Sequence, residues 1–219
     1  SDRPVIMLTG HFGNWELLGY LLATLGFDLE AVARAMDNPR VNRWLTEIRE
    51  RRGLRLITKF GATSRMVNVL ERGGTLAFIA DQNAGDKGMF VPFFGRLAST
   101  YKSIGLLAMQ FRTPIICGYA IRRHKQFHFD IGATDIIYPE DWADQPDPLY
   151  YITARYMRAI ESMVRLAPHQ YLWIHRRWKS RPRHERMNKP MPDTLEHKLR
   201  ALPWIDDQAI EQLKIPLHR

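Results

Sequence analysis

Short apolar runs alternate with longer amphipathic stretches along most of this 219-residue chain. The runs have the length of buried strands and cover residues 5–9, 29–34, 54–57, 75–80 and 114–121. Between and after these runs, the spacing of apolar residues predicts helices at residues 14–25, 38–52, 62–72, 102–111 and 147–166. Strands that are continuously apolar, rather than alternating, are typical of a sheet covered on both faces. The sequence therefore predicts an α/β fold with a mostly parallel central sheet flanked by helices on both faces.

The remaining segments complete the expected layout. Additional strands, the first two antiparallel, are predicted at residues 127–131, 136–138 and 170–174, and a long irregular stretch at 81–100. Residues 1–182 are expected to form one domain. Residues 183–219 are rich in proline and polar side chains, so they are expected to form a peripheral tail with short helices.

A histidine follows the first apolar run closely. His11 lies between Gly10 and Gly13, and Glu16 comes five residues later, where a helical pattern begins after the predicted cap Asn14. Ligands of such sheets bind beyond the carboxyl ends of the strands, so His11 is expected at the mouth of a cleft. A histidine accepts protons near neutral pH, and a carboxylate on its other ring nitrogen fixes the tautomer. His11 and Glu16 are therefore candidates for a general base and its orienting acid.

The spacing of this pair is weak support when taken alone. With eight histidines and 23 acidic residues, chance gives about 0.8 such pairs in the chain. The alternative is a histidine that only caps the helix, with Glu16 favoured in the first turn by the helix dipole. Phe12 and Trp15 would surround a reactive site with apolar surface, which suits a greasy substrate.

A long loop rich in glycine and aromatic residues follows the fourth apolar run. It begins at Asp81, just past a predicted strand end, and carries Phe90, Phe93 and Phe94. Long loops of this kind in a compact domain are commonly functional. The three phenylalanines are expected to line an acyl or membrane-facing channel, with packing onto the core as the alternative.

Positive charge is concentrated near the end of the chain. The net charge is +9, and residues 151–190 hold ten Lys or Arg and two Glu, a local net charge of +8. Within this region, Arg176, Arg177 and Lys179 are interleaved with tryptophans. Arginine binds phosphates in bidentate fashion, and tryptophan suits a membrane interface, although the same mixture also suits nucleic acid. An anionic partner is expected, with a solvated surface as the alternative.

Several classes of protein are disfavoured by what the sequence lacks. No apolar stretch approaches the ~18–20 residues of a membrane-spanning helix. Neither the Gly-x-Ser-x-Gly elbow of a serine hydrolase nor the His-Glu-x-x-His zinc motif occurs. Cys117 is the only cysteine, so no intramolecular disulfide forms, and its apolar surroundings predict a buried side chain.

Three segments in this order resemble the lipid A late acyltransferases, the lauroyl and myristoyl transferases of lipopolysaccharide assembly. The matching pieces are His-Phe-Gly-Asn-Trp-Glu at 11–16, the loop from Asp81-Gln82 to Phe94-Gly95, and Trp-Ile-His-Arg-Arg-Trp-Lys-Ser-Arg-Pro at 173–182. The resemblance covers nearly all of residues 4–182. It implies a fold like that of the wider glycerophosphate acyltransferase superfamily, which shares the histidine-x4-acid pattern.

The resemblance also implies roles for the site residues. His11 would act as general base on a hydroxyl of a lipid acceptor, and Glu16 would orient and charge-balance it. The hydroxyl would attack the thioester of an acyl carrier protein or of coenzyme A, with no metal and no bound redox cofactor. The residues expected to bind substrate are Arg34, Arg49, Asp81, Gln82, Arg176, Arg177 and Lys179, and those expected along the acyl channel are Phe12, Trp15, Phe90, Phe93 and Phe94.

Partners and a location follow from the same resemblance. The expected partners are an acyl carrier protein, a glycolipid or phospholipid acceptor and an anionic membrane surface, without nucleic acid. The expected location is the cytoplasmic face of the bacterial inner membrane, with peripheral attachment or an anchor in an N-terminal segment absent from this chain. Two alternatives stay open: acyl transfer to another acceptor, such as a phosphatidylinositol mannoside or a lysophospholipid, and a nucleic-acid-binding module that uses residues 171–186.

Overall fold

The computed structural model describes residues 3–51, 53–58, 61–124 and 126–215. Within them, six strands form one sheet in the order β3-β2-β4-β1-β7-β8, and two more strands form a hairpin. Neighbouring strands of the sheet are parallel, except that β8 is antiparallel to β7. The strands are β1 (Val5–Thr9), β2 (Leu29–Val32), β3 (Arg55–Ile57), β4 (Thr75–Ile79), β5 (Met89–Phe93), β6 (Arg96–Thr100), β7 (Ile115–Arg123) and β8 (His128–Ile137).

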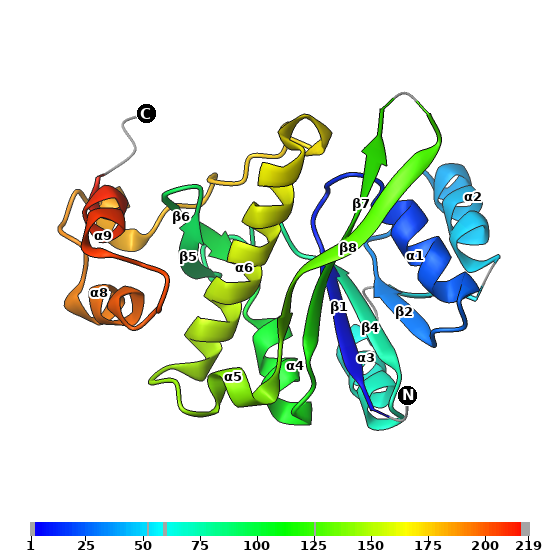
Figure 1. Ribbon diagram of the computed structural model, residues 1–219, viewed down its shortest axis with the longest axis horizontal. Coiled ribbons are helices and arrows are strands. Elements are labelled where there is room, and N and C mark those ends of the chain that lie inside the picture. The colour runs from blue at the N-terminus through cyan, green and yellow to red at the C-terminus, as the bar shows by residue number, and fades with distance from the viewer. Residues whose placement is uncertain (1–2, 52, 59–60, 125, 216–219) are drawn as a thin grey trace.

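Helices cover both faces of the sheet, which confirms the predicted α/β architecture (Figure 1). The first two helices lie on one face, and α3, α4 and α6 lie on the other. The side chain of Asn14 accepts a hydrogen bond from the backbone of Leu17, as expected of the first helix cap. The helices are α1 (Trp15–Thr24), α2 (Pro39–Glu50), α3 (Ala62–Glu71), α4 (Ser103–Phe111), α5 (Pro139–Ala143), α6 (Pro148–Leu166), the 3-10 turn η1 (Pro168–Gln170), α7 (Arg183–Arg186), α8 (Asp193–Arg200) and α9 (Asp207–Lys214).

The main core lies on the α6 side of the sheet. This helix is nearly surrounded by protein, and its fully buried side chains include Tyr156, Met157, Ile160, Met163 and Val164. A separate and smaller apolar cluster lies beneath α1 on the opposite face, formed by Ala23, Leu29, Leu54 and Leu56. The two faces of the sheet are therefore filled unequally.

Three segments differ from the sequence-based prediction. Residues 81–100, expected to be irregular, contain the hairpin of β5 and β6, and its turn places Phe94 and Gly95 at positive φ. Residues 128–137 form one strand, because an irregularity opposite Cys117 and Gly118 absorbs the break in the pattern. Residues 170–174 form no strand. The backbone there bonds to Pro168 and His11, which leaves one isolated bridge between Phe12 and Tyr171.

The C-terminal tail packs more closely than its composition predicts. Leu199, Leu202, Ile210 and Leu213 are buried and belong to the main core cluster. Figure 1 shows α8 and α9 beyond the β5–β6 hairpin, at one end of the molecule. Among the described residues, no helix is both long and apolar enough to span a lipid bilayer.

Arg177 lies inside the protein, although it belongs to the basic segment. Its residue is only 2% exposed. The guanidinium donates to the carbonyl oxygen of Ser99 at 2.5 Å and to Oγ1 of Thr100 at 2.7 Å, and it lies over the ring of Phe93. Burial lowers the pKa of this guanidinium from its usual value. The predicted contact of Arg177 with a substrate phosphate is therefore corrected: its side chain fastens the segment after α6 to β6.

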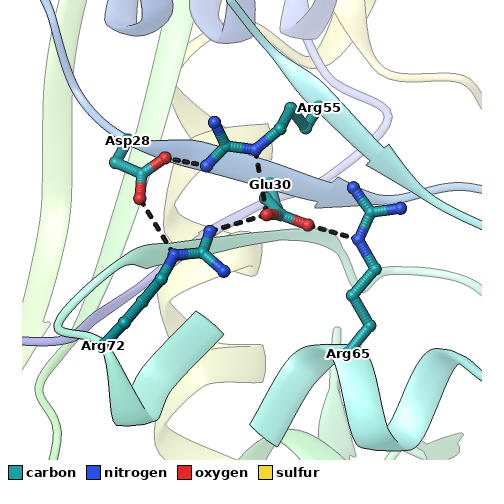
Figure 2. Close-up of polar contacts among 5 residues, drawn as sticks. All are labelled: Asp28, Glu30, Arg55, Arg65 and Arg72. Atoms are coloured by element: carbon teal, nitrogen blue, oxygen red, sulfur yellow. Dashed lines mark hydrogen bonds and ion pairs between the residues drawn. The ribbon is translucent and has the colours of Figure 1, made fainter. Parts of the chain in front are cut away.

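A second buried charge lies near the amino end of β2, where Figure 2 shows Glu30 surrounded by three arginines. The Glu30 carboxylate is 3% exposed and accepts hydrogen bonds from Arg55 at 2.9 Å, Arg65 at 2.7 Å and Arg72 at 2.6 Å. Asp28 binds two of the same arginines, Arg55 and Arg72. Arg55 belongs to β3, Arg65 to α3, and Arg72 follows α3 directly. The network therefore ties β2 to strand β3 and to helix α3.

The two neighbouring arginines of the basic segment are expected to differ in their effect on stability. Arg177→Ala removes two hydrogen bonds and leaves a cavity, so the free energy of unfolding should fall by about 3 kcal/mol. Arg176→Ala changes an exposed side chain and should stay within about 0.5 kcal/mol of the wild type. Urea unfolding followed by circular dichroism measures both, and equal losses would contradict the assignment.

The network around Glu30 is expected to contribute to stability through its buried carboxylate. Glu30→Gln keeps the size of the side chain but removes the charge that three arginines share, so it should cost about 2 kcal/mol. The matched control is Asp130→Asn, which weakens an exposed pair with Arg123 and should cost less than about 0.5 kcal/mol. Thermal and urea unfolding of both variants test the difference, and a Glu30→Gln protein as stable as the control would argue against it.

Candidate active site

His11 and Asp81 lie side by side at the carboxyl edge of the sheet. β1 and β4 are parallel neighbours, and their last residues, Thr9 and Ile79, are paired. His11 and Asp81 each come two residues after that pair, so the register of the strands brings them together. Nδ1 of His11 is 2.8 Å from Oδ1 of Asp81. The Asp81 side chain is 1% exposed, whereas that of His11 is 20% exposed.

This contact selects one tautomer of the neutral imidazole. A carboxylate can only accept a hydrogen bond, so in the neutral ring Nδ1 of His11 donates to Asp81 and Nε2 keeps a lone pair. Within the described residues, Nε2 makes no hydrogen bond. The ring of Trp15 meets the imidazole edge to face, with the centroids 5.2 Å apart. The arrangement is that of an oriented general base with its reactive nitrogen available.

Glu16 does not contact His11 as the sequence predicts. Its carboxylate accepts two hydrogen bonds from Arg49 of α2, one from Nε at 2.9 Å and one from Nη2. Glu16 lies in the first turn of α1 and reaches sideways to α2, whereas β4 brings Asp81 directly to the imidazole. The predicted His11–Glu16 contact is thus replaced by His11–Asp81. The hydrogen bond to Glu16 raises the pKa of Arg49, so that side chain keeps its positive charge.

The turn that carries His11 depends on Gly13. This glycine has a φ of 59°, and a β-carbon built on it would lie 2.1 Å from the carbonyl oxygen of Ala120. Its N–H donates to the carbonyl of Gln170 at 2.9 Å, and the N–H of Asn14 donates to that of Ala120 at 2.8 Å. No other residue fits this approach. The turn is therefore fixed to both β7 and η1.

The segment after η1 closes over the Asp81 loop. Nε2 of His175 accepts a hydrogen bond from the backbone of Asn83 at 2.9 Å, and burial lowers the pKa of His175, which favours the neutral ring that this contact needs. The side-chain amide of Asn83 donates to Oγ of Ser180 at 3.2 Å. Oδ2 of Asp81 and the hydroxyl of Tyr171 are both buried without a hydrogen bond inside the described chain. Burial, reinforced by the Asp81 carboxylate, raises the pKa of Tyr171.

A cavity of about 580 Å³ opens beside this histidine. Near His11 it is polar, and the side chains there include Glu16, Arg34, Arg49 and Gln82. Farther along, it runs between α1 and the sheet and is apolar, lined by Met7, Leu18, Leu22, Leu29, Leu54 and Leu56. A cavity of this size, with a few polar groups at one end, suits a ligand that has a polar and an apolar part.

The predicted acyl channel lies elsewhere than expected. Trp15 lines the cavity. Phe12 and Phe93 are fully buried in the main core, and Phe90 and Phe94 pack against it, so none of these four lines the cavity. Phe90, Phe93 and Phe94 were expected there because the β5–β6 hairpin, which turns them toward the core, was predicted as an irregular loop. Phe12 was expected there because it follows His11 in the chain, but it forms a bridge with Tyr171 and is buried.

The predicted substrate-binding residues are divided between two places. Arg34, Arg49 and Gln82 line the cavity, with Asp81 behind His11. The other three belong to the basic segment, where Arg177 is internal while Arg176 and Lys179 are exposed.

Small residues are a signal of the cavity that the sequence reasoning missed. Gly19 of α1, Ala31 of β2 and Ala77 of β4 all line it. Protein interiors are close-packed, so small side chains on both the helix and the strands leave space that larger ones would fill. Such residues in apolar runs that otherwise hold leucine and isoleucine mark where the core remains open.

Comparison with known proteins identifies relatives of this chain. Residues 1–180 match the family model described as bacterial lipid A biosynthesis acyltransferase. The lipid A biosynthesis palmitoleoyltransferase of Escherichia coli (strain K12) is 28% identical over 187 residues, 83% of this chain and 58% of the relative. The lipid A biosynthesis lauroyltransferase of the same strain is 25% identical over 188 residues, with the same coverage. A lipid A biosynthesis acyltransferase of Haemophilus influenzae (strain ATCC 51907 / DSM 11121 / KW20 / Rd) is 24% identical over 178 residues, 80% of this chain and 53% of the relative.

The chain spans somewhat more than half the length of these relatives. The family model, in contrast, extends over the entire sheet, the cavity and the segment that closes over Asp81. It therefore includes every residue assigned above to the candidate site. On this match, the chain belongs to the bacterial lipid A biosynthesis acyltransferase family.

Proposed function

We propose that this chain carries the acyl-transfer site of a lipid A acyltransferase, with His11 as the general base. The reaction would move a fatty acyl chain from an acyl carrier protein thioester to a hydroxyl of a lipid A precursor. The observation that carries the proposal is the His11–Asp81 pair, which presents Nε2 at the mouth of an apolar cavity. The names of two relatives, a palmitoleoyltransferase and a lauroyltransferase, describe acyl transfer in lipid A biosynthesis.

The proposed chemistry needs one proton acceptor that later becomes a donor. Nε2 of His11 takes the proton of the acceptor hydroxyl as the oxygen attacks the thioester carbonyl carbon. The tetrahedral intermediate then collapses, the carbon–sulfur bond breaks, and the imidazolium returns its proton to the leaving thiolate. Asp81 holds Nδ1 and stabilises the imidazolium between these two steps. The products are an ester and a free thiol, so the protein ends in its starting state.

Glu16 and Arg49 act as a unit in this proposal. Their bidentate contact offsets the Glu16 charge and places a guanidinium on the cavity wall, where negative charge develops on the thioester oxygen. Arg34 is more exposed and pairs with Asp37 at 3.5 Å. Exposed pairs contribute only about 0–1 kcal/mol, so Arg34 can exchange this partner for a phosphate of the acceptor.

The cavity under α1 is the proposed site of the acyl chain. Much of its apolar wall, including Leu29, Leu54 and Leu56, belongs to the smaller cluster, so a hydrocarbon chain would complete the packing of that face. Gln82, beside Asp81, lies at the polar end, where the thioester and the acceptor hydroxyl would meet.

The donor, the location and the remaining contacts belong to the proposal as well. We favour acyl carrier protein over coenzyme A as the donor because it is an acidic protein. The exposed Arg176 and Lys179, in the segment after η1, would complement its charge. The proposed location is the cytoplasmic face of the bacterial inner membrane, where a lipid acceptor and a soluble thioester donor can meet. Neither a metal nor a bound redox cofactor is needed for the steps above.

Removal of the base is expected to slow acyl transfer without unfolding the protein. His11→Ala and Asp81→Asn should each lower the rate by about 10²–10⁴-fold, because the first removes the proton acceptor and the second favours the wrong tautomer. Glu16→Ala, which releases Arg49, is expected in the same range. The assay is mass-spectrometric detection of acyl transfer from acyl carrier protein thioesters to a lipid A precursor, with thermal unfolding measured in parallel. His128→Ala, an exposed histidine on β8, is the control; folded His11→Ala protein with near wild-type transfer would refute the proposal.

Filling the cavity is expected to change which acyl chains are accepted. Ala77→Phe adds a ring to the cavity wall, so transfer of long chains should fall at least about tenfold relative to short ones, since each lost methylene contact is worth ~0.8 kcal/mol. Ala133→Phe places the same ring on the exposed surface of β8 and should leave the preference unchanged. Competition between thioesters of different length in one reaction measures the ratio. An unchanged ratio in folded Ala77→Phe protein would place the acyl chain outside this cavity.

A further inference from the structure

Helix α2 has an apolar stripe but buries none of its side chains. Val41, Trp44, Leu45 and Ile48 share one face, since they are spaced three and four residues apart. Trp44 is 59% exposed and Val41 is 39% exposed. A surface helix usually packs such a stripe onto the core. Here Leu45 and Ile48 are half-buried, whereas Val41 and Trp44 remain exposed among the described residues.

Two basic side chains border the stripe, since Arg40 comes four residues before Trp44 and Arg51 seven residues after it, whereas Arg43 lies on the opposite, polar side of the helix. Arg40 and Arg43 are exposed, and neither side chain makes a hydrogen bond or ion pair with any described residue. Arg51, just after the helix, is also exposed and without such a contact. An amphipathic helix with tryptophan on its apolar face and arginine beside it is typical of a helix that lies in the interface of an anionic membrane.

The segment that enters α2 forms part of the cavity rim. Arg34, Met36 and Asp37 line the cavity, as does Arg49 of α2 itself. The N–H of Met36 donates to Oδ1 of Asn42 at 2.9 Å, which ties this rim to the helix. Met36 is 50% exposed, so the rim of the cavity also carries an exposed apolar side chain close to the start of α2. In Figure 1, α2 lies at the outer edge of the molecule, beside α1.

We propose that the α2 face, formed by Met36, Val41 and Trp44 with Arg40 and Arg51, docks on an anionic lipid bilayer. The docked helix would hold the cavity rim at the lipid surface, so that a lipid acceptor reaches His11 without crossing water. Charge decides between a bilayer and a second copy of this chain. A two-fold interface through this face would bring the same arginines together, whereas anionic headgroups complement them. The purpose of the docking rests on the proposed function, but the docking itself requires no catalysis.

Vesicle binding tests the charge and the apolar stripe separately. The protein should co-float with phosphatidylcholine vesicles that contain phosphatidylglycerol, and bind less well to phosphatidylcholine alone or at high salt. Arg40→Gln with Arg51→Gln should weaken binding about 30-fold, because each basic residue near an anionic surface contributes about fivefold. Val41→Asp with Trp44→Asp should abolish measurable binding. Leu106→Asp, at an equally exposed leucine on α4 across the sheet, is the matched control and should bind like the wild type.

A fluorescent label reports whether the stripe itself enters the lipid. Cys117 is fully buried, and burial raises the pKa of its thiol, so a maleimide dye reacts with an introduced cysteine only. The dye on Trp44→Cys should shift to the blue and be quenched by brominated lipid when vesicles are added. The same dye on Leu106→Cys should remain in water.

Other results would overturn the proposal. These are a lack of binding to anionic vesicles, full binding by the Val41→Asp, Trp44→Asp protein, or a Trp44→Cys label that stays in water on bound protein. Analytical ultracentrifugation without lipid tests whether a second copy of this chain occupies the face instead. A dimer that the Val41→Asp, Trp44→Asp variant dissociates would identify that second copy. His11→Ala should bind vesicles like the wild type, so a failure of the catalytic proposal is separable from a failure of docking.

Discussion

The parallel pairing of β1 with β4 is the constraint on which the candidate site depends. It brings together His11 and Asp81, which are 70 residues apart in the chain. The same strand also serves both faces of the sheet, because successive side chains point in opposite directions. Ile6 is buried in the main core, whereas Met7, next to it, packs against the smaller cluster and lines the cavity. A slip of one residue would exchange these faces and separate the imidazole from its carboxylate. The hydrophobic packing that specifies the register thus specifies the chemistry as well.

The unequal filling of the two faces explains where a ligand can enter. On one face, α6 packs with large aromatic and aliphatic side chains and leaves a continuous core. On the other, α1 lies over strands that carry alanine at positions 31 and 77, and the space between them stays open. Because this space reaches His11 at the carboxyl edge, the open face and the reactive group form one site. Gly13 supports that geometry, since the lack of a side chain lets the His11 turn come close enough to β7 for the N–H of Asn14 to bond to the carbonyl oxygen of Ala120.

The sequence predicted the parts of the molecule that follow local rules, and it failed where distant segments meet. Continuous apolar runs and the cap at Asn14 were enough to locate most strands and helices and the strand-end position of His11. The partner of His11 was predicted wrongly, because Glu16 is near in the chain whereas Asp81 is near only once the strand order is known. Arg177 is a similar case: arginine is rarely buried, and only the hairpin that it bonds to explains why it is. Membership of the family was recognisable because it depends on motifs and not on contacts.

The cavity under α1 also has a consequence for how the molecule opens. The helices on that face pack on a small cluster and an open space, while the opposite face is joined to the large core, so the α1–α2 layer is the part with the least apolar contact to lose. Local opening free energies follow such differences, and this layer is therefore the natural unit of partial unfolding. An acyl chain held in the cavity, as proposed above, would bind the closed layer and not the opened one, and would stabilise the closed layer by mass action. The ligand would then be a temporary part of the hydrophobic interior, and its departure would return the layer to its looser state.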